Sequence, residues 1–195
     1  MFFCSLLDLH FLYSWLPILM HDAGLQIQRA ILVTTLLPVG GILGALTLGR
    51  IIDKKSSYRS LAWCYAGAAI FIFCIGLAGV SMTLLVSTVF AAGFCVIGCQ
   101  IGSNTLAAEV YPTSIRSTGV GWALGIGRVG SMVGPLVGGV LLSIGGTPQR
   151  VFWVAAIPAL VACAAALFIT RQLANRAHSD EVGRGFRAKL AAYTD

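Results

Sequence analysis

The sequence predicts an all-α, polytopic membrane protein with six transmembrane helices. Hydrophobic residues make up 57% of the 195 positions and charged residues only 10%, with 23 glycines, a balance far from that of soluble domains. Six apolar stretches approach or exceed the roughly 20 residues that a helix needs to cross a hydrocarbon core about 30 Å thick. The alternating pattern of a membrane β-barrel is missing from them, and a lone strand in lipid would leave its backbone groups unpaired.

Charged residues mark the ends of the spans in chain order. We place the six spans at about residues 2–20, 30–51, 60–79, 82–108, 118–142 and 150–171. Arg29 precedes the second span, residues 52–59 separate the second from the third, and residues 109–117 separate the fourth from the fifth. Arg150 and Arg171 are the first and last residues of the sixth. Because the connections are short, we expect an antiparallel bundle over residues 1–171, followed by a basic cytoplasmic tail at residues 172–195.

The basic residues predict the orientation. Ten of the 13 lysines and arginines fall on one side, namely Arg50, Lys54, Lys55, Arg59, Arg116, Arg171, Arg176, Arg184, Arg187 and Lys189. Arg29 and Arg150 lie on the other side and Arg128 lies within a span. Since basic residues are retained in cytoplasmic loops, both termini are expected to face the cytoplasm. The net charge of +6 is then explained by the basic cytoplasmic loops and their attraction to anionic lipid headgroups. The charge distribution does not support nucleic-acid binding.

Arg128 is a charge inside a span. It lies in an otherwise uncharged, glycine-rich stretch from about Thr118 to Leu142, and ten residues of helix place it roughly 15 Å deep, near the membrane midplane. A central arginine costs about 2.5–3.5 kcal/mol on insertion scales, so such residues usually face a bundle interior or a watery cavity. We therefore expect function near Arg128. The alternative is a structural pairing with a carbonyl or an acid inside the bundle.

The sequence gives no reason to expect a cofactor, a metal or an enzymatic centre. All six cysteines fall within apolar spans as small hydrophobes, and Cys95 and Cys99, one turn apart, lack an accompanying histidine or carboxylate. Residues 125–130 match the dinucleotide pattern G-x-G-x-x-G, but they lie inside an apolar span rather than after a strand. An intramembrane protease would need a serine with a histidine on another span, or two aspartates within the spans. The histidines are only His10, His21 and His178, no G-x-S-G motif occurs, and Asp8 has no partner acid within the spans.

The second span ends in the sequence GGILGALTLGRIIDKK. Its glycines allow close helix approach, and Arg50, Asp53 and Lys54 follow at the exit. One interpretation is a packed helix with an ordinary positively charged loop. The order G-R-x-x-D-K-K also resembles the signature loop of the major facilitator superfamily, where acidic and basic residues form a cytoplasmic charge network. That resemblance implies a gating network of Arg50, Asp53 and Lys54, although Ser56 stands where the family usually has glycine.

Residues 109–139 carry a more specific resemblance. Glu109, the segment 111–113, Arg116, the segment 118–119 and the run from Gly121-Trp122 to Gly127-Arg128 are similar to the tenth and eleventh helices of the aromatic acid:proton symporters. FFCSLL and residues 14–17 resemble the seventh helix of the same family. The likeness covers most of residues 1–171 and implies the C-terminal six-helix half of a twelve-helix transporter. The N-terminal half, which holds most of that family's proton-coupling acids, is then missing here.

The resemblance and the residue chemistry together suggest sites. The candidate substrate-binding residues are Arg128, Gln100 and Asn104, because a guanidinium group grips a carboxylate in two places and amides can add hydrogen bonds. For the two amides, hydrogen bonding between helices is the alternative. Glu109 and Arg116 bracket a cytoplasmic turn as a candidate gating pair, with plain topology control as the alternative for Arg116.

Small residues on the fifth span predict close and smooth helix contacts, as a rocking transporter needs. These candidate packing residues are Gly121, Gly125, Gly130, Gly134 and Pro135, with Gly138 continuing the second group. Asp8 and His10 depart from the family pattern of the first span. Either side chain can titrate when desolvated, and Asp8 as a proton carrier is one hypothesis.

The resemblance implies proton-coupled uptake of small aromatic carboxylates such as 4-hydroxybenzoate across the bacterial inner membrane. The expected partners are a small organic anion, H⁺, the lipid bilayer and the N-terminal six-helix half. Without that half we expect the chain to be inactive. The alternative is a non-transporting truncated remnant, or an assembly partner of another transporter half.

Overall fold

The computed structural model describes the backbone of residues 1–55, 59–78 and 81–191 and the side chains of residues 1–52, 59–78, 81–108 and 110–172. Within these ranges the chain is helical and contains no strand, which confirms the predicted fold class. The helices are α1 (Phe2–Asp22), α2 (Ile27–Thr34), α3 (Leu36–Lys55), α4 (Arg59–Leu77), α5 (Met82–Val110), α6 (Arg116–Ser143) and α7 (Pro148–Ala191). Six segments among the described residues are long and apolar enough to cross a membrane.

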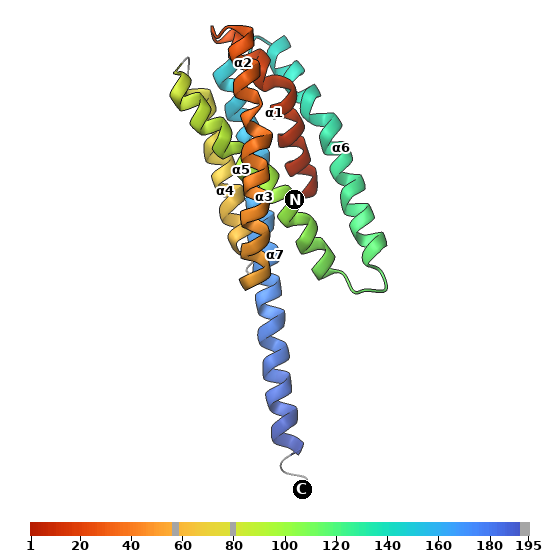
Figure 1. Cartoon of the computed structure of the whole chain (residues 1–195). Helices are drawn as coiled ribbons and strands as arrows, with labels where there is room; N and C mark the ends of the chain where they lie inside the picture. The colour runs from red at the N-terminus through yellow and green to blue at the C-terminus, as the bar shows by residue number, and fades with distance from the viewer. Residues whose placement is uncertain (56–58, 79–80, 192–195) are drawn as a thin grey trace.

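The helices pack as three pairs: α3 with α5, α1 with α6, and α4 with α7 (Figure 1). Helix α1 also contacts α7, α2 and α5, so it joins the pairs, and its Leu12, Leu16 and Leu19 are fully buried. Helix α6 lies at the edge, with extensive contacts to α1 and few to α5 or α7. The last turns of α7 extend beyond the bundle toward the C-terminus (Figure 1). Most of the α6 surface is therefore uncovered in this chain.

Glycines in the left-handed conformation end two of the spans. Gly24 has a φ of 106° after α1, and Gly145 has a φ of 79° after α6. At each of these ends, two backbone N–H groups donate hydrogen bonds to carbonyls of the last helical turn. The donors are Gly24 and Leu25 after α1, and Gly145 and Gly146 after α6. This arrangement is the Schellman motif, which satisfies carbonyls that a helix end leaves free.

The second span is divided into two helices. Helix α2 ends at Thr34 and α3 begins at Leu36, with Thr35 between them. Pro38 is the physical cause, because a proline has no N–H to donate and its ring crowds the carbonyl of the residue four positions earlier, here Thr34. Together α2 and α3 form a candidate span from Ile27 to Ile52. The sequence predicts this span at about residues 30–51.

Glycines allow α3 and α5 to touch backbone to backbone. A Cβ atom built on Gly40 or Gly44 of α3 would overlap the carbonyl of Phe90 or Phe94 on α5. The contact is reciprocal, since a Cβ atom on Gly93 of α5 would overlap the carbonyl of Leu37. In lipid the hydrophobic effect adds little between helices, so association depends on such close packing.

We expect Gly44→Ala to destabilise the folded chain by about 1–3 kcal/mol, because the new methyl group has to push α3 and α5 apart. Gly49→Ala on the same helix is the matched control, since a Cβ atom there meets nothing within 4 Å and the change in helix propensity is the same. Thermal unfolding of the two variants in one detergent measures the difference. Equal melting temperatures would show that the α3–α5 contact does not limit stability.

Candidate functional site

Helix α6 presents one narrow stripe of glycines to α1. A Cβ atom on Gly130 would overlap the carbonyl of Phe3, and one on Gly134 would lie 2.5 Å from the carbonyl oxygen of Leu7. Gly138 lies against the ring of Trp15, whose indole Nε1 donates a hydrogen bond of 2.8 Å to the carbonyl of Pro135. Despite Pro135, α6 continues unbroken from Arg116 to Ser143. The stripe fixes the rotation of α6 about its own axis.

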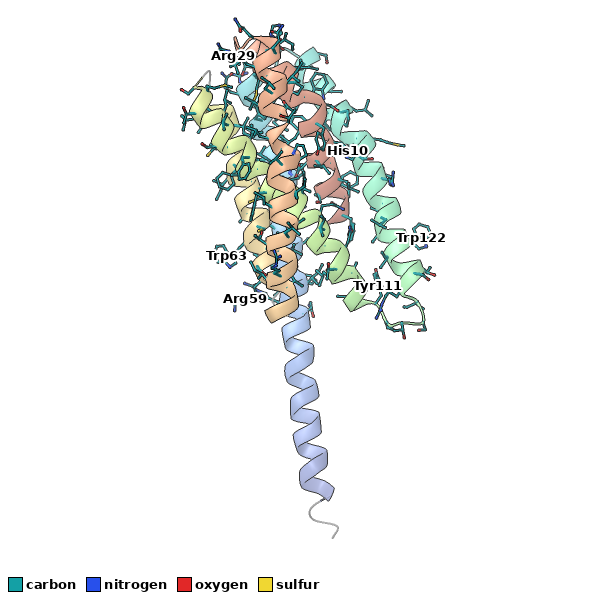
Figure 2. All side chains as sticks on the ribbon, viewed as in Figure 1. His10, Arg29, Arg59, Trp63, Tyr111 and Trp122 are labelled. Carbon is teal, nitrogen blue, oxygen red and sulfur yellow. The ribbon has the colours of Figure 1, made fainter. Side chains whose placement is uncertain are left out.

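Gly121 and Gly125 lie on a different face of α6. A Cβ atom on either of them would meet nothing within 4 Å. Gly125 and Gly134 are nine residues apart, which is two and a half helical turns, so they point in opposite directions. Thr118, Gly121, Trp122 and Gly125 line a shallow apolar groove on this side, and Figure 2 shows Trp122 projecting away from the bundle. We call the surface of Gly121, Gly125 and Arg128 the free face of α6.

Arg128 belongs to this free face. It follows Gly125 by three residues and Gly121 by seven, the spacing of neighbours along one side of a helix. Its side chain is exposed, and within the described part of the chain its guanidinium group has no hydrogen bond or ion pair. Its backbone carbonyl accepts a hydrogen bond of 2.6 Å from the hydroxyl of Ser131. The cost of this charge in hydrocarbon argues that the free face meets protein or water rather than lipid.

Gln100 and Asn104 share one side of α5. Asn104 is exposed, whereas Oε1 of the half-buried Gln100 is enclosed and has no hydrogen-bond partner in the described structure. No hydrogen bond joins either amide to Arg128 among the described residues. Ala123 of α6 does line a cavity of about 270 Å³ together with Ser103 and Ala107 of α5, but five residues of helix turn Arg128 about 140° away from Ala123. The chain by itself therefore does not assemble the three candidate residues into one pocket.

The residues of the predicted charge network lie at one end of the bundle. Arg50 is exposed there, while the side chains of Asp53, Lys54 and Glu109 lie outside the described residues. Nε of Arg116 donates a hydrogen bond of 3.3 Å to the carbonyl of Tyr111 and so holds the turn between α5 and α6. Figure 2 shows Arg59 and Tyr111 at this end of the bundle and Arg29 at the opposite end. The basic residues named here thus separate by side as the sequence predicts.

A buried polar cluster lies where α1, α4 and α5 meet. Ser5 and Asp8 of α1 are 1% and 2% exposed, and Ser103 of α5 is fully buried. The hydroxyl of Tyr65 on α4 forms a hydrogen bond of 2.7 Å with that of Ser103. The sequence singles out Asp8 as an unusual charge, but nothing in the pattern around Tyr65 or Ser103 marks those two as its neighbours. Their proximity depends on how three helices are rotated.

Comparison with known proteins identifies the family of the chain and its relatives. The family model of the Major Facilitator Superfamily matches residues 1–193. The chain is 41% identical over 166 residues to the gallate transporter of Pseudomonas putida, covering 85% of this chain and 37% of that protein. It is 37% identical to the 4-hydroxybenzoate transporter PcaK of Pseudomonas aeruginosa, with the same coverage. The benzoate transport protein of Acinetobacter baylyi is 33% identical over 150 residues, 74% of this chain and 32% of that protein. The chain thus spans less than two fifths of these relatives.

Proposed function

The chain belongs to the Major Facilitator Superfamily, and we propose that it forms the C-terminal six-helix half of a transporter for small aromatic carboxylates. Secondary transporters of this kind place the substrate near the membrane midplane, between two bundles that rock against each other. The relatives named for gallate, 4-hydroxybenzoate and benzoate indicate the substrate class. All three compounds combine one carboxylate with one aromatic ring.

The unpaired Arg128 on the free face of α6 is the observation that carries this proposal. An arginine deep in a span needs a counter-charge, and the chain supplies none to it within the described residues. A guanidinium group offers two parallel hydrogen bonds to a carboxylate and also stacks on aromatic rings. The substrate, or an acid of the N-terminal half, is the natural partner. Gln100 and Asn104 would then contribute hydrogen bonds from α5 once the second half closes the site.

We propose that the N-terminal half packs against the groove on the free face. The open glycines at positions 121 and 125 permit another helix to approach closely. The length of the relatives supplies the candidate, since this chain matches only 37% of the gallate transporter. A lipid-facing role fits poorly because Arg128 occupies the same side of the helix.

We further propose a direction of transport and its coupling to protons. We expect both termini to face the cytoplasm of a bacterial inner membrane, with the basic end of the bundle on that side. Arg50, Asp53, Lys54, Glu109 and Arg116 would form a charge network that closes the cytoplasmic side and breaks as the halves rock. Proton entry would then drive the uptake of the anion. The family and the relatives are transporters rather than enzymes.

Expression of the chain with and without a complementary half tests this function. The partner is the N-terminal six helices of the Pseudomonas putida gallate transporter, produced in cells that lack aromatic acid uptake. We expect labelled gallate or 4-hydroxybenzoate to enter only cells that contain both halves, because neither half encloses a site alone. Uptake by the chain alone would contradict the proposal. Halves that co-purify without transporting would instead indicate a non-transporting remnant or assembly partner.

A further inference from the structure

The polar cluster between α1, α4 and α5 holds an enclosed carboxyl oxygen that has no hydrogen-bond partner among the described residues. Oδ1 of Asp8 and Oγ of Ser5 are both enclosed, and neither makes a hydrogen bond in the described structure. The two residues are three positions apart and share one side of α1. Ser5 lies close to the Tyr65 hydroxyl but outside hydrogen-bond geometry, and Asp8 follows about one helical turn farther along α1. Ser103, the partner of Tyr65, lies seven residues before the end of α5, roughly 10 Å into the bundle.

The hydrogen bonds around Tyr65 have a definite direction. Ser103 donates its hydroxyl proton to the carbonyl of Cys99 at 2.7 Å. A serine has only one proton to donate, so in the 2.7 Å contact between Tyr65 and Ser103 the tyrosine must be the donor. The phenol oxygen of Tyr65 is then left with free lone pairs and no proton to offer. The cluster therefore presents an acceptor toward α1, not a donor.

No ion pair to Asp8 is present among the described side chains. Asp8 is only 2% exposed, so water does not compensate a negative charge there either. Among the described side chains, the other titratable groups on α1 and the helices around it are Cys4, His10, Tyr13, His21 and Asp22 of α1, Arg29 of α2, Arg59, Cys64, Tyr65 and Cys74 of α4, Cys95 and Cys99 of α5, Arg116 and Arg128 of α6, and Arg150, Cys163 and Arg171 of α7, with the amino group of Met1 before α1. Of the basic residues, His10 and His21 bond to the carbonyls of Leu6 and Leu25, and Nε of Arg116 donates to the carbonyl of Tyr111. The other arginines on these helices are exposed.

An ionised carboxylate can only accept hydrogen bonds, and leaving one buried and unpaired carries a heavy free-energy cost. A protonated carboxyl group is neutral and has one proton to donate. The acceptor on Tyr65 and the amphoteric hydroxyl of Ser5 match that neutral form. We propose that Asp8 is a proton-binding site of this half-bundle, with Ser5, Tyr65 and Ser103 forming its polar surroundings. Its use as the carrier of the co-transported proton rests on the proposed function.

Infrared spectroscopy of the chain in liposomes tests proton binding without any need for transport. The carbonyl stretch of a protonated carboxyl group is expected at neutral pH in the unmodified chain and is expected to vanish in Asp8→Asn. Asp22→Asn is the matched control, because Asp22 is an exposed residue at the end of the same helix. The control should keep the band. A neutral-pH spectrum without the band, or a band that survives Asp8→Asn, would overturn the proposal.

The Tyr65→Phe variant tests the surroundings of the site. Removing the phenol oxygen takes away one acceptor of the polar cluster around Asp8, so the Asp8 band should shift to the frequency of a carboxyl group with weaker hydrogen bonding. Trp63→Phe on the same helix is the control, since Trp63 is 76% exposed and projects outward from α4 (Figure 2). A band that does not move in Tyr65→Phe would exclude Tyr65 from the site.

Coupling is tested with the chain paired to its complementary half. Asp8→Asn is expected to abolish accumulation of substrate above the external concentration but to preserve exchange of labelled for unlabelled substrate, which needs no net proton movement. Undiminished accumulation by Asp8→Asn would exclude Asp8 as the proton carrier. If the unmodified pair shows neither activity, the proposed transport function fails. The infrared result still decides whether Asp8 binds a proton.

Discussion

Replacing Gly134 by leucine is expected to detach α6 from the rest of the chain. Gly134 lies directly on the α1 backbone, because a Cβ atom added to it would lie 2.5 Å from the carbonyl oxygen of Leu7 and 3.1 Å from the amide nitrogen of Phe11. A leucine side chain would force the helices apart and break the hydrogen bond from Trp15 to Pro135. We expect a loss of about 3 kcal/mol or more. Because α6 has few other contacts, protease cleavage within it should accelerate sharply while α3 and α5 stay protected.

Gly125→Leu on the same helix is both the control and a second test. In the isolated chain it should leave stability within about 1 kcal/mol of the unmodified protein, because nothing lies within 4 Å of this position. In the assembled transporter it should prevent the two halves from co-purifying, if the free face of α6 is the surface that meets the N-terminal half. Equal destabilisation of the isolated chain by both substitutions would contradict this assignment of the two glycine faces. Normal assembly of Gly125→Leu would place the N-terminal half elsewhere.

Arg128→Ala is expected to abolish measurable uptake by the assembled transporter. The loss of two charge-assisted hydrogen bonds to a carboxylate costs about 2–3 kcal/mol, which corresponds to roughly 30- to 150-fold weaker substrate binding. Arg128→Lys should recover only part of the affinity, because an ammonium group keeps the charge but cannot form the planar pair of bonds. Equilibrium binding of labelled 4-hydroxybenzoate to the assembled protein measures the effect directly.

The control for Arg128 is Arg29→Ala. Arg29 is an exposed arginine at the end of the bundle opposite Arg59 (Figure 2), so its removal changes the net charge by the same amount in the first turn of a span rather than deep within one. We expect its substrate affinity to stay within about twofold of the unmodified protein, since exposed charges contribute little. Unchanged affinity and uptake in Arg128→Ala would remove Arg128 from the substrate site. The arginine would then be a structural charge that pairs with the other half.

Most of the fold could be predicted from the sequence because span length and composition report directly on the bilayer. The six-helix class and the family are confirmed. The break at Thr35 was not predicted, although Pro38 carries a local signal for it. A helix that loses one hydrogen bond can continue, bend or divide. A proline alone does not decide among these outcomes, because α6 continues unbroken around Pro135. The contacts that surround each helix have to decide.

Far less of the site could be predicted. Arg128, Gln100 and Asn104 are recognisable as unusual residues because a polar group in a span is costly. Their mutual placement depends on the rotation of α5 and α6, and the described structure does not bring Arg128 to the amides. The cluster of Asp8, Tyr65 and Ser103 was beyond sequence reasoning for the same reason. Its members lie on three helices and share no local pattern.

Hydropathy, charge asymmetry and motifs in the sequence indicated six helices long and apolar enough to cross a membrane, which end of the bundle is basic, and which family the chain belongs to. They did so because each property acts along the chain, residue by residue. Only the tertiary structure decided which glycine face of α6 packs on α1 and which stays free. Small residues permit a close approach on either face but specify no partner. The choice was settled by the fit of Gly130, Gly134 and Gly138 to the α1 backbone and Trp15. This fit left Arg128 on the free face, where no described residue pairs with it.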